Sequence, residues 1–121
     1  MAMHEFSICE GLVRAVLREM KKHGAPAGSL RKTRVVVGAL HQIVPDNLTF
    51  AYEALTRDTP AAGSRLKLKV VPITAACRAC GWRGGIRPPV FLCAACHSGG
   101  IELITGRELY LDNLEIEQDD G

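Results

Sequence analysis

Residues 77–96, CRACGWRGGIRPPVFLCAAC, carry two CxxC pairs with twelve residues between them. A CxxC turn places two thiolates on one side of a tight turn, and two facing turns supply the four sulfur ligands that zinc prefers. The candidate zinc ligands are Cys77, Cys80, Cys93 and Cys96. Protein would fill all four positions, so the spacing predicts a structural site with no place for a catalytic water. An iron tetrathiolate uses the same ligands, and the spacing leaves that alternative open.

The segment between the pairs is poor in apolar residues, so metal binding must supply much of its folding free energy, on the order of 10 kcal/mol. His97 directly follows Cys96, at the position that Gly81 occupies after the other pair. We interpret His97 as a solvent-facing residue. The alternative is that its imidazole replaces a thiolate when protonation or nickel loading changes the site.

The segments outside the cysteine pairs predict strands. Residues 65–71, RLKLKVV, alternate strictly, with Leu66, Leu68 and Val70 on one side, which predicts a half-exposed strand. The β-branched run at 34–40, RVVVGAL, predicts a short buried strand. Residues 108–117, ELYLDNLEIE, also alternate, but their phase changes at 112–113, where we expect a bulge.

Two segments predict helices. In residues 7–26, SICEGLVRAVLREMKKHGAP, Ser7 and Glu10 match a capping box, and Cys9 falls on the apolar face as a small buried hydrophobe. A second helix is expected over residues 47–58, capped by Asp46. The predicted fold is therefore α+β: a small three-stranded mixed sheet covered by two helices, with an inserted zinc-ribbon-like domain. Residues 1–73, completed by 105–121, would form the main domain, and residues 74–104 the zinc-binding domain.

Composition narrows the class of protein. The chain has 121 residues and a formal charge of +2, which by itself does not indicate a nucleic-acid-binding protein. Arg78, Arg83 and Arg87, with Trp82 for stacking, keep open the alternative of a zinc-ribbon nucleic-acid-binding or protein-interaction module. No glycine loop for phosphate and no justified cysteine–histidine pair is present, so we expect no enzyme. We also expect a cytoplasmic protein with no membrane span.

Several segments, taken in order, resemble the HypA/HybF family of hydrogenase nickel-incorporation proteins. They are HEFSICEG (4–11), VVVGAL (35–40), VPDNLTFAYEA (44–54), CRAC (77–80), CAACH (93–97) and GRELYLDNLEIE (106–117). The resemblance implies a metallochaperone that binds Ni(II) transiently and holds structural Zn(II). It implies as partners the hydrogenase large-subunit precursor, a nickel-linked maturation GTPase of the HypB type and, for some members, urease maturation proteins. It leaves a homodimer open and implies no nucleic-acid partner.

The resemblance implies that the imidazole of His4 and the main-chain nitrogens of Met3 and His4 bind nickel, with that of Ala2 where the N-terminus includes it. Glu5 is the adjacent acidic residue that the resemblance also assigns to this site. Family chains begin Met-His-Glu, whereas this chain has Met1 and Ala2 in front. A start at Met3 restores the family arrangement, in which amine, one amide and imidazole supply three donors. If Met1 alone is removed, His4 becomes the third residue, and the terminal amine, two amides and the imidazole supply all four nitrogens of a planar site. Retention of Met1 makes amine chelation less favourable, and the sequence leaves the three forms open.

Overall fold

A computed structural model describes residues 3–117. Its elements are α1 (Met3–Lys22), β1 (Leu30–Gly38), the 3-10 turn η1 (Ala39–His41), α2 (Pro45–Thr56), β2 (Arg65–Val71), β3 (Thr74–Cys77), β4 (Arg83–Gly85), β5 (Ile101–Thr105) and β6 (Leu109–Ile116). They form two compact units. We call residues 1–36, 43–69 and 110–121 the helical unit, and residues 37–42 and 70–109 the cysteine unit.

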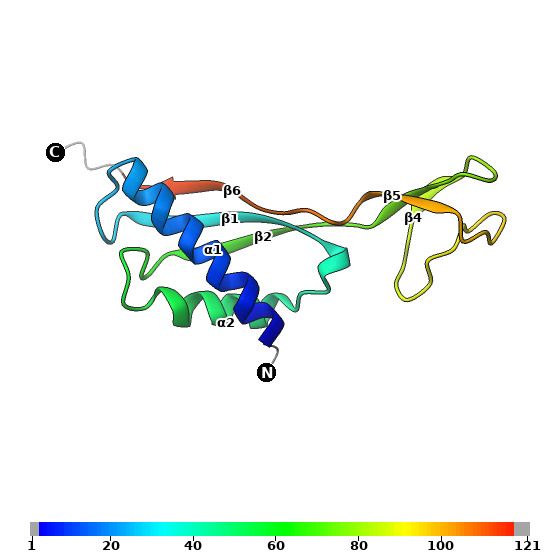
Figure 1. Cartoon of the computed structure of the whole chain (residues 1–121). Coiled ribbons are helices and arrows are strands. Elements are labelled where there is room, and N and C mark those ends of the chain that lie inside the picture. The colour runs from blue at the N-terminus through cyan, green and yellow to red at the C-terminus, as the bar shows by residue number, and fades with distance from the viewer. Residues whose placement is uncertain (1–2, 118–121) are drawn as a thin grey trace. The chain divides into compact units, whose positions relative to one another are not determined.

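The helical unit is built on a three-stranded mixed sheet with the order β2-β1-β6. The amide of Glu117 donates to the carbonyl of Ser29 at 2.8 Å, which joins the end of β6 to the start of β1, so these two strands are antiparallel. β2 runs in the same direction as β1, and α2 makes the crossover between them (Figure 1). The predicted mixed sheet is confirmed.

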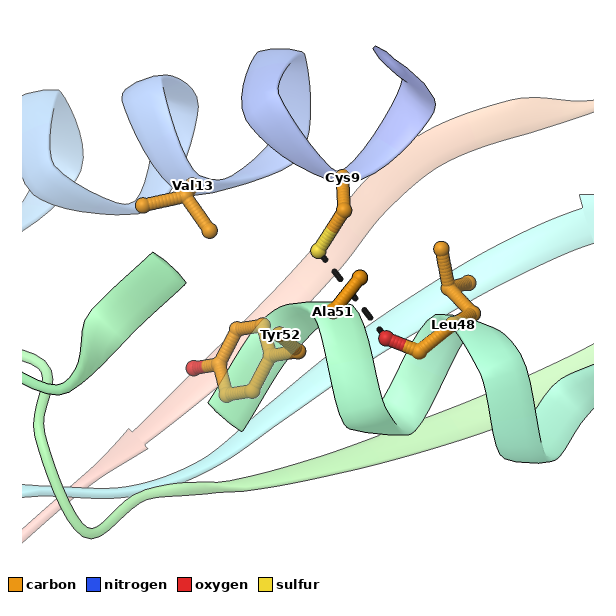
Figure 2. Packing of buried hydrophobic residues seen from close by; sticks show 5 residues of the cluster. All are labelled: Cys9, Val13, Leu48, Ala51 and Tyr52. Carbon is orange, nitrogen blue, oxygen red and sulfur yellow. Dashed lines mark hydrogen bonds between the residues drawn. The ribbon is translucent and has the colours of Figure 1, made fainter. Parts of the chain in front are cut away.

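Both helices pack on one face of this sheet. Figure 2 shows one core cluster, in which Cys9 and Val13 of α1 face α2. Its buried members are Cys9, Val13, Leu48, Ala51 and Tyr52, with Leu66 and Leu68 of β2 packed against them. A second cluster comprises Val16, Met20, Leu30 and Ala61, with Leu111, Leu114 and Ile116 of β6 against it. Apolar side chains from both edge strands thus point towards the helices.

The start of α1 corrects the predicted capping box. In the described residues the helix starts at Met3, so Ser7 lies inside it and caps nothing. The helix begins early because Phe6 and Ile8 pack against the core, which outweighs the local capping preference. The prediction that Asp46 caps the second helix is also wrong. α2 begins at Pro45, a residue that suits the first helical position, and Asp46 lies in the first turn, where a carboxylate is favourable.

The observed strands differ in part from those that the local sequence patterns predict. β1 starts at Leu30, four residues before the predicted strand, because its early residues have tertiary partners: the Thr33 hydroxyl lies 2.8 Å from the Tyr52 hydroxyl. β2 has the predicted bounds, but Val70 is 52% exposed. Leu111 and Leu114 both pack against the second cluster although they are three residues apart, which confirms the change of phase between them.

Candidate metal centres

The cysteine unit is framed by a second, antiparallel sheet with the order β4-β3-β5. β3 ends at Cys77, whose amide donates to the carbonyl of Trp82 at 2.7 Å and closes the first CxxC turn. The amide of Cys93 donates to the carbonyl of Ser98 at 2.9 Å and closes the second. Short main-chain hydrogen bonds therefore hold each pair of cysteines in a tight turn.

The two turns repeat one backbone geometry. The Gly81 amide donates to the Cys77 carbonyl at 3.0 Å, and the His97 amide donates to the Cys93 carbonyl at 2.9 Å. Gly81 has φ of 83° and His97 has φ of 63°, so both occupy the left-handed region. A side chain is disfavoured there, whereas glycine is not. His97 thus stands, exposed, at a backbone position that favours glycine.

We expect His97→Gly to retain zinc and to stabilise the cysteine unit by about 1 kcal/mol, because glycine relieves the left-handed conformation. Gly81→Ala is the converse variant: a Cβ at this position meets nothing within 4 Å, so only conformational strain is added. We expect it to destabilise the unit by a similar amount. Chelator-driven zinc release and urea unfolding measure both effects. Loss of zinc from His97→Gly would instead assign the imidazole to the metal.

The four cysteines come together as one cluster. Their sulfur atoms all lie within 4.8 Å of one another, with Cys77 and Cys96 at 3.7 Å and Cys80 and Cys93 at 3.5 Å. Zinc–sulfur bonds of about 2.3 Å place tetrahedral sulfurs about 3.8 Å apart. The donor set therefore fits a tetrahedral, thiolate-preferring ion and leaves no open position on it.

Main-chain amides polarise this cluster. Burial raises the pKa of Cys93, but hydrogen bonds from the amides of Cys96 and Ala95, each 3.3 Å from its sulfur, and from neighbouring thiols outweigh burial and lower the pKa to about 6. The Trp82 amide lowers the pKa of Cys80, but the hydrogen bond to Cys93, burial and the other thiols raise it to about 12. The main-chain amides thus favour the thiolate form of Cys93, and a bound metal displaces the protons of any remaining thiols. The sequence predicted the four sulfur ligands but not these main-chain donors.

Cys9 is separate from the cluster. Its side chain is fully buried, and its thiol lies 4.0 Å from the Leu48 carbonyl oxygen (Figure 2). Burial, with a smaller effect of Glu10, raises its pKa to about 11. Cys9 therefore stays a neutral thiol, which confirms its interpretation as a buried hydrophobe.

The candidate nickel residues lie at the start of α1. His4 is exposed, whereas Glu5, its neighbour, is 2% exposed, and its Oε1 atom accepts a hydrogen bond from the Val44 amide at 3.3 Å. The first amides of a helix have no acceptor within the helix, and in α1 these amides adjoin His4. Met1 and Ala2 lie outside the described residues. Sequence reasoning missed the role of Val44, which no local pattern marks.

The comparisons decide the family. Residues 3–116 match the family model described as "Hydrogenase/urease nickel incorporation, metallochaperone, hypA". The chain belongs to the HypA family. It is similar to the hydrogenase maturation factors HypA of Desulfosudis oleivorans, 35% identical over 96% of this chain and 100% of the relative, and of Solidesulfovibrio magneticus, 37% identical over 95% and 100%. The solution structure of the Ni metallochaperone HypA from Helicobacter pylori has the same fold, with a TM-score of 0.62 at 20% identity, over 97% of this chain and 100% of that one.

Membership of HypA confirms the predicted resemblance and places the chain among metallochaperones, which are not enzymes. The alternative of a nucleic-acid-binding module depended on Trp82 as the residue on which a base would stack. Trp82 instead packs, half-buried, against the small apolar cluster of Ile73, Ala75 and Ile86. Arg78 pairs with Glu102 at 3.7 Å. Within residues 3–117, no helix has both the length and the apolar character needed to cross a membrane.

Proposed function

We propose that this HypA chain binds nickel(II) at its N-terminal end and delivers it during maturation of NiFe hydrogenase. The observation that carries the proposal is the family match over residues 3–116, which includes the His-Glu pair at the start of α1. The exposure of His4 at a helix start supports it, because an imidazole and the first main-chain nitrogens of the helix, all suitable nickel donors, adjoin one another there.

The proposed nickel donors are the imidazole of His4 and main-chain nitrogens of Met3, His4 and, where it is the first residue, Ala2. The carboxylate of Glu5 already accepts the Val44 amide in a buried place. We therefore assign Glu5 a positioning role: it ties the first turn of α1 to the residue before α2, and so holds His4 in place.

The proposed zinc ligands are Cys77, Cys80, Cys93 and Cys96, and the fit of their sulfur distances to a tetrahedral ion supports the assignment. Zinc would supply the cysteine unit with the folding free energy that its small apolar cluster cannot. We assign residues 74–104 to this zinc domain, and residues 1–73 with 105–121 to the nickel domain. His97 is not in the resting ligand set, although it adjoins Cys96.

The proposed partners are the large-subunit precursor, as nickel acceptor, and a HypB-type GTPase. Hydrolysis of GTP falls to that partner because the chain carries no glycine-rich phosphate loop. The family description also includes urease, so a urease maturation protein is a second acceptor class.

All five cysteines are unpaired, which supports a reducing compartment such as the cytoplasm.

One experiment tests the nickel proposal and the form of the N-terminus together. Intact mass identifies the residue that carries the free amine, and nickel is then titrated into zinc-loaded protein against a chromophoric chelator. We expect one nickel per chain. A start at Ala2 should give a planar, slowly exchanging site that also binds copper(II) tightly, because four nitrogens are then available. A six-coordinate, fast-exchanging site on protein that begins at Ala2 would contradict the planar site, and absence of nickel binding would overturn the proposal.

A further inference from the structure

The face of the sheet in the helical unit that lies away from the helices carries exposed cations. Leu66 and Leu68 of β2 pack against the core, so the residues that alternate with them lie on the other face. These are Arg65, Lys67 and Lys69, all exposed. Within residues 3–117 none of the three forms an ion pair. We call these three residues the β2 cations.

The neighbouring strands extend this face with a different balance of charge. The Thr33 hydroxyl meets Tyr52 on the helix side, so the next residue of β1, Arg34, lies on the same face as the β2 cations. Glu115 of β6 lies there too, with its carboxylate 3.5 Å from the Arg34 guanidinium. On this face, the carboxylate of Glu115 therefore balances a positive charge near β6, whereas the positive charges of the β2 cations have no acidic partner among the described residues.

β2 is also an edge strand. It stands at the end of the order β2-β1-β6, and within the described residues no strand pairs with its outer side. Every residue of β2 is exposed or half-buried, in contrast to the largely buried β1. The outer side of such a strand presents main-chain donors and acceptors to which another extended chain can bind.

We propose that the outer edge of β2 binds an extended acidic segment of a partner protein, which adds a fourth strand to the sheet. Carboxylates at alternate positions of the added strand lie on one face with the same repeat as the β2 cations, and each cross-strand ion pair favours binding. A peptide is favoured over a nucleic acid because it can use the main-chain edge. In addition, neither β1 nor β2 has an aromatic residue on which a base could stack. This site involves neither metal and goes beyond the proposed nickel function.

The first test maps the site on the full-length, zinc-loaded protein by amide NMR. The probe is a capped peptide, Thr-Glu-Val-Glu-Val-Glu-Thr, and we expect its chemical-shift changes to centre on β2. Two N-methylated versions of the peptide block hydrogen bonding along one or the other of its edges. We expect one version to lose binding and the other to retain it, because an added strand pairs through a single edge. Shift changes centred elsewhere, or equal effects of the two versions, would overturn the proposal.

The second test neutralises charge. We expect Lys67→Gln with Lys69→Gln to weaken peptide binding about five- to tenfold, because two cross-strand ion pairs are lost. Lys21→Gln with Lys22→Gln, exposed at the end of α1, makes the same change in net charge and should have no effect. Equal losses in both variants would overturn the proposal. Tighter binding of oligothymidylate at β2 would assign the edge to nucleic acid, and self-association of the neutralised protein without peptide binding would assign the cations to edge protection.

Discussion

Cys93→Ser is expected to abolish zinc binding and to unfold the cysteine unit. Cys93 is fully buried, and its sulfur accepts two main-chain hydrogen bonds that favour the thiolate, so a serine hydroxyl cannot replace it as a ligand. The apolar cluster of this unit is small, and the loss removes a metal contribution on the order of 10 kcal/mol. Zinc content should fall from one per chain to near zero, and the amide NMR signals of residues 74–104 should collapse to unfolded positions.

The matched control is Cys9→Ser, which alters the one cysteine outside the cluster. Serine can still donate a hydrogen bond to the Leu48 carbonyl, so we expect full zinc content and a modest loss of stability in the helical unit. The helical unit has two core clusters of its own, and its signals should persist in Cys93→Ser. A Cys93→Ser protein with zinc and dispersed signals would contradict the assigned ligand set.

His4→Ala is expected to weaken nickel binding by more than about 100-fold while zinc and fold are unchanged, because the variant removes a nickel donor rather than a supporting contact. His4 is exposed, so its loss leaves no cavity. Nickel titration with parallel zinc analysis measures the effect. His23→Ala removes an exposed imidazole paired with Glu19 near the far end of α1 and should leave nickel binding intact. Unchanged nickel affinity in His4→Ala would remove the central site assignment.

Glu5→Gln separates the two roles of the residue beside His4. The glutamine side chain keeps a carbonyl oxygen that can accept the Val44 amide, but it is not a carboxylate ligand. If Glu5 acts by positioning, nickel affinity should stay within about threefold of the native value, since the hydrogen bond is retained. A loss as large as that of His4→Ala would make the carboxylate a ligand.

Local sequence determined most of what this protein is. The two CxxC pairs specified the four-sulfur cluster, because each turn places its thiolates by a few main-chain bonds within a short segment. Alternation along residues 65–71 specified β2, and the change of phase in β6 predicted that Leu111 and Leu114 would share one face of the sheet. These signals depend on the periods of strands and turns, which are properties of the chain itself.

Tertiary packing decided the rest. The helix starts at Met3 rather than at Ser7 because Phe6 and Ile8 reach a core that is completed by α2. Glu5 is buried because its partner, the Val44 amide, is 39 residues away. The openness of the β2 edge depends on the strand order. Each of these features arises from groups distant in sequence, whose burial and hydrogen bonding exist only once the sheet and helices have come together.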